Sequence, residues 1–466
     1  MKPADIFDRE AEWATLEAMW RKRGPQLAFV LGRRRIGKSH LLSRFARHVD
    51  GLYYQATRRT ETEQLVQLSR LLATRFDDPG LRHGAGFASW EALLAYVTER
   101  AQGAPFLLVL DEFPYLASAS PALTSIIQRC WDHDWPQSRV RLVLSGSYVT
   151  AMKALEGADQ PLYGRRTLHL GVGPFDFADA TAFMPRHTPW DRLVAYAVFG
   201  HLPGHLARID PDSPIAANAA GALLDPSGPL VDDAQHMLDA FLNDARVPYS
   251  ILEAIALGDH TWTGITRRVG LSGGALLRPL QWLEEMGLVA RVVPLTERNP
   301  SRSKRAVYRV TDPYVAFWHR TVGPLHQAGT IGLVAPERLW TEVVSPRLSE
   351  HLGPVFEEVC RQFVRRAERL PIRPVRVGEW WDVRSEHQLD IAAIDAEGRL
   401  FAAECKLGGV TREDLTTLRL RAGLLQREMG ASVAHLAFFS ARDQADDGVR
   451  SAVAAGEVSW FTLEDL

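Results

Sequence analysis

The chain has 466 residues, 46% of them hydrophobic, and a formal net charge of −2 at pH 7. Its length favours about three domains, and its balanced charge excludes a protein that binds nucleic acid or membranes through overall charge alone. Cys130, Cys360 and Cys405 are widely spaced and match no zinc or disulfide pattern. Because no apolar run approaches membrane-spanning length and the N-terminus has no apolar signal core, we expect a cytoplasmic protein without a membrane partner.

Residues 32–39 read Gly-Arg-Arg-Arg-Ile-Gly-Lys-Ser and fill every fixed position of the phosphate-binding pattern G-x-x-x-x-G-K-[ST]. An apolar run at residues 26–31 predicts a buried strand before this loop, and the periodicity of residues 40–47 predicts a helix after it. That order directs backbone N–H groups and a helix N-terminus toward one point, which is how a polyanion is held. The sequence therefore predicts a site for a nucleoside triphosphate.

Within this loop we expect the Lys38 ammonium to reach the β- and γ-phosphates of ATP and the Ser39 hydroxyl to bind Mg²⁺. The expected phosphate-binding residues of the loop are Gly32, Arg35, Gly37, Lys38, Ser39 and His40. The predicted cofactors are therefore ATP and Mg²⁺.

A second apolar run, at residues 106–110, ends in the acids Asp111 and Glu112. We expect Asp111 to hold the water shell of Mg²⁺ and Glu112 to orient and deprotonate the attacking water, which would make the chain an ATPase. The alternative is a solvated strand end before a turn. A third apolar run, at residues 140–144, leads to Ser147, which either senses the γ-phosphate or belongs to a plain Ser/Gly turn.

Further motifs follow along the first half of the chain: Phe7, Arg9, Glu10 and Glu12; Asp111-Glu112-Phe113-Pro114; Gly146-Ser147; and Tyr163-Gly164-Arg165-Arg166. Together with the arginine-rich loop, and in this order, they resemble the archaeal-type ATPase family, which belongs to the STAND branch of AAA-like P-loop ATPases. The resemblance implies that residues 7–12 pack near the adenine.

The resemblance also implies that residues 200–203, Gly-His-Leu-Pro, correspond to the family's Gly-Gly-x-Pro element, with Pro203 against the base. His201 replaces the second glycine of that element. Arg165 or Arg166 would contact the γ-phosphate, either within the same chain or from a neighbouring subunit of a homo-oligomer. The alternative for both arginines is a solvated basic turn.

The pattern of residues 247–320 is typical of a winged helix. Helices are expected at residues 249–257, at 262–269 and after Ser272, followed by a hairpin of residues 290–293 and 306–310. Against one acid, Glu297, the hairpin carries the basic residues Arg291, Arg298, Arg302, Lys304, Arg305 and Arg309. A basic wing beside an exposed third helix predicts duplex DNA as a partner. A protein contact or an intramolecular hinge, which such modules also form in STAND-type ATPases, stays open.

In the C-terminal part, Asp390 and the segment Glu404-Cys405-Lys406 form the pattern D-x₁₃-E-x-K on two expected strands of a hairpin. This is the arrangement of PD-(D/E)XK nucleases. Strand alternation places Glu404 and Lys406 on one face. We expect Asp390, Glu404 and Glu357, which lies on a helix at residues 356–364, to hold Mg²⁺, and Lys406 to position the nucleophile.

Residues 378–381, Gly-Glu-Trp-Trp, together with the Asp390 strand, resemble the nuclease-like domain of unknown function that accompanies archaeal-type ATPases. Gln388 stands where that domain often has a glutamate, and a folded but inactive site remains the alternative. Six nearby arginines would suit a phosphate backbone: Arg361, Arg365, Arg366, Arg369, Arg373 and Arg376.

The sequence thus predicts an α/β multidomain protein: a P-loop parallel-sheet ATPase core (residues 1–174), a helical lid (175–244), a winged helix (245–322) and a C-terminal α/β restriction-endonuclease-like domain (323–466). The expected function is a DNA-associated ATPase whose nucleotide state controls a Mg²⁺-dependent nuclease, in defence against foreign DNA or in mobile-element processing. Its catalytic residues would be Glu112, Asp390, Glu404 and Lys406. The alternative is a STAND-type signalling or regulatory ATPase whose C-terminal domain binds DNA or a protein without cutting.

Overall fold

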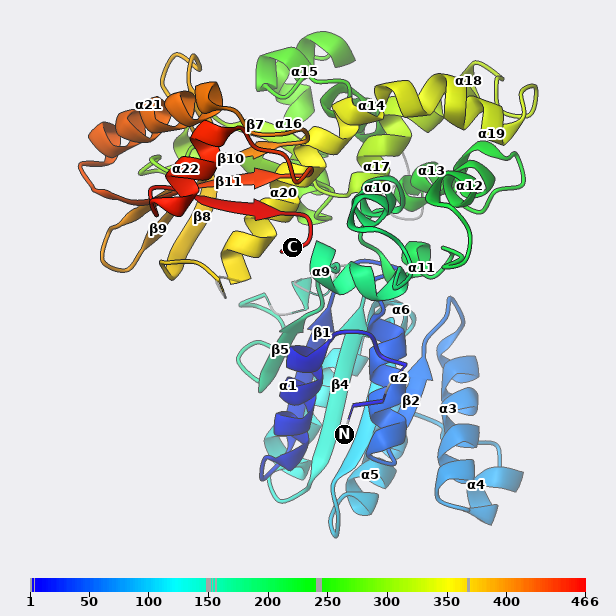
Figure 1. Cartoon of the computed structure of the whole chain (residues 1–466). Coiled ribbons are helices and arrows are strands. Elements are labelled where there is room, and N and C mark those ends of the chain that lie inside the picture. Colours follow the sequence, from blue (N-terminus) through cyan, green and yellow to red (C-terminus); the bar gives the residue numbers. More distant parts are fainter. Residues whose placement is uncertain are drawn as a thin grey trace. The chain divides into compact units, whose positions relative to one another are not determined.

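The computed structural model describes residues 2–3, 5–147, 152, 154–155, 157–239, 245–366 and 369–466. The chain divides into two compact units, Met1–Pro174 and Phe175–Leu466, and each has its own hydrophobic core (Figure 1). The predicted boundary between lid and winged helix, at residue 244, lies outside the described residues. Among the described residues, no helix combines the length and the apolar character needed to cross a membrane.

A five-stranded parallel sheet forms the centre of the first unit, in the order β2-β3-β4-β1-β5. Its strands are β1 (Gln26–Leu31), β2 (Leu52–Gln55), β3 (Phe106–Asp111), β4 (Val140–Gly146) and β5 (Leu168–Gly171). The three central strands are buried along their whole length, because a parallel sheet is covered on both faces. This burial explains why the strands appear as continuous apolar runs, and all three strands predicted in this unit are confirmed.

Helices surround this sheet and begin with recognisable signals. They are α1 (Glu10–Arg21), α2 (Lys38–His48), α3 (Glu61–Arg75), α4 (Pro79–His83), α5 (Trp90–Arg100), α6 (Phe113–Ala119) and α7 (Leu123–Arg129), which continues into the π-helical turn η1 (Cys130–Asp134). In α2, Leu41, Leu42 and Phe45 recur at helical spacing and are buried. A capping box of Thr60 and Glu63 starts α3.

The second unit begins with helices: α9 (Phe177–Ala180), η2 (Thr181–Phe183), α10 (Pro189–Phe199), α11 (Pro203–Leu206), α12 (Ile215–Ala219), η3 (Ala220–Leu224) and α13 (Asp233–Asp239). The last seven residues of α10 are all buried, so this helix runs through the core. It ends at Gly200, whose φ is 75°. A Cβ there would lie 2.7 Å from Asp312 Oδ1, so the position requires glycine for both its conformation and its space.

Three helices and a hairpin follow, as predicted: α14 (Arg246–Ala256), α15 (Trp262–Val269), α16 (Gly273–Glu285), β6 (Val289–Val292) and β7 (Val307–Val310). The short helix η4 (Pro300–Arg302) lies in the hairpin connection. The chain then continues through α17 (Pro313–Phe317), η5 (Trp318–Val322), α18 (Gly323–Gln327), α19 (Pro336–Leu339), η6 (Trp340–Val344) and η7 (Ser345–Arg347) to the long helix α20 (Leu348–Arg366).

A second five-stranded sheet, in the order β12-β11-β10-β9-β8, forms the C-terminal part. Its elements are β8 (Pro374–Trp381), β9 (Gln388–Asp395), β10 (Leu400–Lys406), α21 (Arg412–Met429), β11 (Val433–Ser440), α22 (Asp447–Ala454) and β12 (Ser459–Thr462). β9 is antiparallel to both β8 and β10, whereas β10, β11 and β12 run parallel. The predicted hairpin and the helix after residue 411 are confirmed.

The two helices α20 and α21 cover opposite faces of this sheet. Ala403 of β10 belongs to the same core as the buried side chains of α20, whereas its neighbour Ala402 shares a core with those of α21. Successive side chains of a strand point to opposite faces, so this alternation places one helix on each side (Figure 1). Two of the widely spaced cysteines belong to one core, because Cys360 of α20 is buried in it and Cys405 of β10 packs against it.

Candidate functional site

The glycine loop connects β1 to α2 at the carboxyl end of the parallel strands. Gly37 has a φ of 88° and Arg35 a φ of 66°, both in the left-handed region. A Cβ on Gly32 would lie 2.5 Å from the carbonyl oxygen of Val172, so only glycine fits this turn. The loop therefore has the tight backbone that the phosphate-binding pattern requires. Of its other predicted residues, His40 is exposed and lies 3.8 Å from the Asp5 carboxylate.

Lys38 is buried at the start of α2, although lysine is rarely buried without a partner. Its ammonium group donates to the carbonyl oxygen of Arg33 (3.2 Å) and to the Ser147 hydroxyl (3.1 Å). Burial lowers the pKa of Lys38, and the nearby negative charges of Asp111 and Glu112 oppose this change. The Arg33 carbonyl oxygen and the Ser147 hydroxyl are neutral, so a polyanion bound at the loop would supply the negative charge that pairs with the Lys38 ammonium.

Asp111 ends β3 and Glu112 follows it, and both carboxylates accept hydrogen bonds from distant segments. Asp111 is fully buried, and its Oδ2 accepts hydrogen bonds from the Ser39 hydroxyl (2.6 Å) and from the Tyr53 hydroxyl (2.6 Å). Its Oδ1 accepts from the backbone N–H of Glu112 (3.0 Å). Ser39 and Asp111, the two residues predicted to bind Mg²⁺ and its water shell, are therefore in direct contact.

Tyr53 was not predicted as a site residue. It lies on β2, beside β3, and burial followed by the charge of Asp111 raises the pKa of its hydroxyl. A neutral tyrosine donates a hydrogen bond, so it fixes one oxygen of Asp111. The sequence by itself shows only a tyrosine at this position. Its role follows from the strand order, because β2 lies beside β3 and so brings the Tyr53 hydroxyl to Asp111.

Ser147 follows β4 and connects the lysine to the second acid. Its hydroxyl donates to Glu112 Oε1 (2.5 Å), and its backbone N–H donates to Glu112 Oε2 (3.4 Å). Because Lys38 donates to the same hydroxyl, the predicted lysine, general base and sensor form one continuous network. The role of each in catalysis remains a prediction.

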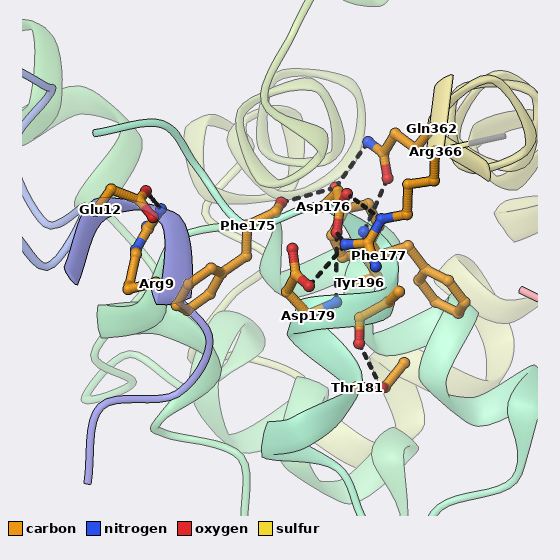
Figure 2. A network of polar contacts seen from close by, with 11 residues as sticks. Arg9, Glu12, Phe175, Asp176, Phe177, Asp179, Thr181, Tyr196, Gln362 and Arg366 are labelled. Carbon is orange, nitrogen blue, oxygen red and sulfur yellow. Dashed lines mark hydrogen bonds and ion pairs between the residues drawn. The ribbon is translucent and has the colours of Figure 1, made fainter. Parts of the chain in front are cut away.

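Arg9 links the loop to the end of the first unit. Its buried guanidinium donates to the carbonyl oxygens of Ile36 (3.2 Å) and Gly173 (2.7 Å), and it forms an ion pair with Glu12 (2.9 Å; Figure 2). The segment of residues 7–12, which the resemblance placed near adenine, thus supports the loop itself. Phe7 is 45% exposed.

Arg165 and Pro203 were also predicted to contact the nucleotide. Arg165 forms a two-point ion pair with Asp132 (2.9 and 2.8 Å), so the structure places it in a basic turn that already has an acidic partner. Pro203 belongs to the second unit, where it begins α11. The contact of each with nucleotide remains a prediction.

Asp390 and Glu404 lie side by side in the C-terminal sheet. The β9–β10 register pairs Ile391 with Ala403, so the next pair is Asp390 with Glu404, as the spacing predicted. Both are buried, and Asp390 Oδ2 accepts a hydrogen bond from the backbone N–H of Cys405 (2.9 Å). We refer to Asp390, Glu404 and Glu357, which lies on helix α20, as the carboxylate site.

The carboxylates repel one another and attract arginines. Burial, followed by the charge of Asp390, raises the pKa of Glu404 to about 7. The same two causes raise the pKa of Glu357, of which a quarter of the side chain remains exposed. Arg421 lies 2.7 Å from Glu404, and Arg361 lies 3.7 Å from Glu357. A buried acidic cluster of this kind is stabilised by a proton or a cation.

The geometry fits a divalent cation held by two of the three carboxylates. Asp390 and Glu404 lie directly opposite each other in the β9–β10 register, which places their carboxylates side by side on one face of the sheet. Glu357 does not join them in a group whose ligand atoms all lie within 4.8 Å. Mg²⁺ is commonly held by one or two carboxylates and several waters, so we correct the predicted three-ligand set to Asp390 and Glu404, with Glu357 alongside.

Two further features differ from expectation. Lys406 forms an ion pair with Asp414 (2.7 Å) in the first turn of α21. Among the residues that the structure describes, the single group of three ligand atoms within 4.8 Å of one another comes from Asp382, Glu386 and His387, in the turn between β8 and β9. Exposed acidic groups of this kind are common on proteins that bind no ion there.

The six arginines between residues 361 and 376 do not form a free basic face. Four of them have acidic partners within the chain: Arg361 with Glu357, Glu358 and Glu379; Arg365 with Glu358; Arg366 with Asp176 and Asp179; and Arg369 with Asp465. Arg376 donates to the carbonyl oxygen of Leu295 (2.7 Å). The expected phosphate-binding surface is therefore wrong for most of this segment, because its charges stabilise the second unit.

Two segments of the chain match known protein families. Residues 6–206 match a family described as an ATPase domain predominantly from Archaea, and residues 318–418 match archaeal and bacterial proteins of unknown function. The uncharacterized protein MJECL04 of Methanocaldococcus jannaschii is 26% identical over an alignment of 418 residues, which covers 86% of this chain and 87% of the relative.

Solved structures resemble the fold. The Walker-type ATPase PABY2304 of Pyrococcus abyssi has a TM-score of 0.55 and 22% identity, covering 68% of this chain and 97% of that one. The ORC2 protein of Aeropyrum pernix, in ADPNP-ADP complexes, has a TM-score of 0.47 and 15% identity, covering 71% and 96%. Residues 6–206 of this chain are thus similar to an ATPase domain found predominantly in Archaea, and the first unit has a parallel sheet with a phosphate-binding loop.

Proposed function

We propose that the chain is a DNA-associated ATPase whose nucleotide state controls a Mg²⁺-dependent nuclease site of the PD-(D/E)XK type. The observation that carries the proposal is the β9–β10 register, which sets Asp390 opposite Glu404, with Lys406 two residues further along the same strand. A β-hairpin that carries these three residues, with a helix on each face of its sheet, is the arrangement that favours a phosphodiester-cleaving site. Defence against foreign DNA and mobile-element processing both suit such an activity.

Each residue of the carboxylate site has a separate task in this proposal. Asp390 and Glu404 hold Mg²⁺, and Glu357 orients water at its edge. When bound, the ion supplies an activated water and stabilises charge at phosphorus. Lys406 positions the nucleophile, and Asp414 holds the Lys406 ammonium until DNA enters.

Three helices followed by a hairpin support a winged helix that contacts DNA. Of the six basic hairpin residues, Arg298, Arg302 and Lys304 are exposed, and their side chains have no hydrogen bond or ion pair with any residue in the described part of the chain. Lysine and arginine side chains in this state can bind phosphates and release counterions. These three residues are therefore the proposed phosphate contacts of the hairpin.

Replacing Arg298, Arg302 and Lys304 together by alanine should weaken binding to all DNA sequences alike. We expect the slope of log affinity against log salt concentration to flatten by roughly two to three units, since each lost phosphate contact is worth about 0.9. A salt titration of fluorescent duplex DNA measures this slope. The matched control replaces three exposed arginines of the first unit, Arg70, Arg82 and Arg129. If the hairpin variant keeps the wild-type slope, the hairpin does not contact DNA.

Helix α20 offers a route from the ATPase domain to the carboxylate site. The second unit begins at Phe175, and its first residues bind α20: Arg366 pairs with Asp176 (3.0 Å from Nε) and Asp179 (2.7 Å), as Figure 2 shows. Gln362 of the same helix accepts from the backbone N–H of Phe177 (2.8 Å) and donates to the Tyr196 hydroxyl (3.3 Å; Figure 2). The same helix carries Glu357 and Arg361.

The chain segment that joins Gly173 to Asp176 completes this route. Arg9 bonds the carbonyl oxygen of Ile36, in the glycine loop, and that of Gly173, two residues before the second unit. A nucleotide-dependent change at the loop would therefore act on the segment that ends in Asp176, and Asp176 holds α20. We propose that nucleotide state is transmitted to the carboxylate site through α20.

Arg366→Ala should therefore remove the effect of nucleotide on α20 while leaving ATP binding unchanged. Hydrogen–deuterium exchange of residues 348–366, with and without a non-hydrolysable ATP analogue, measures that effect. Arg365→Ala is the matched control, because Arg365 lies next to Arg366 on the same helix and, among the residues that the structure describes, its ion pair is with Glu358 of that helix. A nucleotide-dependent change that persists in the Arg366→Ala protein would contradict the route.

A regulatory ATPase without nuclease activity remains the second candidate. It is favoured by the arginines at the carboxylate site, since Arg421 already neutralises Glu404 and Arg361 lies beside Glu357. In that case the site is a structural ion cluster, and the C-terminal part binds DNA or a protein without cutting.

A further inference from the structure

Glu379 of β8 connects the hairpin to the carboxylate site, although it was not predicted as a site residue. It is buried, and its two oxygens have different arginine partners. Oε2 lies 2.5 Å from Arg309 of β7, and Oε1 lies 3.3 Å from Arg361 of α20. Arg361 in turn donates to the carbonyl oxygen of Asp390 (2.9 Å). One carboxylate thus joins the hairpin, α20 and the strand that carries Asp390.

The hairpin is also attached to β8 along its connection. The backbone N–H of Leu295 donates to the carbonyl oxygen of Glu379 (2.8 Å), and the Leu295 side chain is buried in the core between the sheet and α21. Arg305 donates to the carbonyl oxygen of Trp381 and lies 3.5 Å from Glu428. Since β8 is the edge strand of the sheet, the hairpin connection covers an edge that would otherwise be open.

Half of the basic residues predicted to bind DNA are therefore engaged within the chain. Arg305 and Arg309 bind the C-terminal part, and Arg291 donates to the carbonyl oxygens of Pro300 (2.5 Å) and Ser303 (2.7 Å). The basic side chains of the hairpin therefore form two sets. The exposed set is Arg298, Arg302 and Lys304, and the inward set is Arg291, Arg305 and Arg309. Only the inward set can sense the state of the carboxylate site.

We propose that Arg309 and Glu379 form a releasable ion pair through which the position of the hairpin sets the divalent-cation affinity of the carboxylate site. The inference rests on the proposed metal site and adds its regulation. With the hairpin docked, Arg309 and Arg361 share Glu379, and their positive charges lie beside the carboxylates. With the hairpin displaced, Glu379 keeps Arg361 alone, and the site becomes more negative.

The direction of the effect follows from charge. A guanidinium near a binding site repels a divalent cation, and partial burial reduces the screening of that repulsion by salt. Removing the charge of Arg309 should therefore increase the affinity of the carboxylate site for a divalent cation. A ligand that draws the hairpin away from β8 would have the same effect, so that engagement of the hairpin by DNA would favour loading of the metal site.

The test measures Mn²⁺ binding to the full-length protein without nucleotide, by the electron paramagnetic resonance of free Mn²⁺. Arg309→Met keeps the length of the side chain and removes its charge. We expect it to tighten Mn²⁺ binding by about three- to tenfold, an effect of a partly screened charge. Arg305→Met is the matched control, because it removes the hairpin's other ion pair with the C-terminal part, to Glu428, and should stay within about twofold of wild type.

Each outcome separates this inference from the metal site on which it rests. Adding Asp390→Ala to Arg309→Met should abolish the gained binding. If wild type binds Mn²⁺ through Asp390 but Arg309→Met does not differ from it, the ion pair has no regulatory role and the metal site stands. If neither protein binds Mn²⁺ through Asp390, both proposals fail. Equal tightening by Arg305→Met would mean that loosening the hairpin, and not the Arg309 charge, is responsible, which also overturns the inference.

Discussion

Glu404→Ala is expected to abolish Mg²⁺-dependent cutting of DNA while ATP hydrolysis stays near the wild-type rate. Glu404 and Asp390 form the pair that fits the ion, and a metal site without one of two carboxylate ligands is inactive. Asp390→Ala and Lys406→Ala should have the same effect, and combining them should add little, because the three residues act as a unit. Cutting of duplex, single-stranded and branched DNA, measured beside phosphate release from ATP, gives both activities.

The matched control for this series is Glu397→Ala. Glu397 lies in the exposed turn between β9 and β10, and in the described part of the chain its carboxylate forms one ion pair, with Arg399 (3.2 Å), so its loss should leave both activities unchanged. If Glu404→Ala reduced ATP hydrolysis as strongly as DNA cutting, the separation of the two activities would be wrong. Cutting that survives in all three site variants would mean that another part of the chain is responsible.

The second large effect is expected at the ATPase domain, where Lys38→Ala should prevent ATP binding and Glu112→Gln should allow binding but stop turnover. Lys38 is a buried cation whose two acceptors are neutral, so its loss removes the charge that holds the phosphates. Glu112 is the predicted general base, and loss of a general base typically lowers a rate by roughly 10²- to 10⁴-fold. Binding of a fluorescent ATP analogue and phosphate release distinguish the two defects.

Lys22→Ala serves as the control, because Lys22 is an exposed residue after α1 and should change neither quantity. Normal turnover by Glu112→Gln would show that Glu112 is not the base. In that event the hydrogen bonds between Glu112 and Ser147 would be structural, and Asp111 would be the acid to test next.

The core of the ATPase domain could be predicted because its signals are local. Strands buried on both faces appear as apolar runs, and a turn that admits only glycine at Gly32 restricts the residue type. The carboxyl ends of parallel strands lie at one edge of the sheet, so Asp111 and Ser147 were expected near Lys38. The β9–β10 hairpin was predictable for a similar reason, since alternation and turn length set the register of Asp390 and Glu404.

The residues that the sequence did not reveal act through contacts between distant segments. Tyr53 binds Asp111 only because β2 lies next to β3, an order that the sequence does not state. The hairpin arginines were all read as contacts for DNA, whereas Arg309 binds Glu379, which is 70 residues away along the chain. Charge counting along a segment cannot distinguish an exposed cation from one with an internal partner, because that depends on tertiary packing.

The most direct test of the account measures DNA cutting by the wild-type protein with Mg²⁺, in the presence of ATP, of a non-hydrolysable ATP analogue, of ADP and of no nucleotide. The account predicts cutting that depends on which nucleotide is bound and that disappears in the Glu404→Ala protein. Absence of cutting of duplex, single-stranded and branched DNA in all four states would contradict it, and would favour a regulatory ATPase whose C-terminal part binds without cutting.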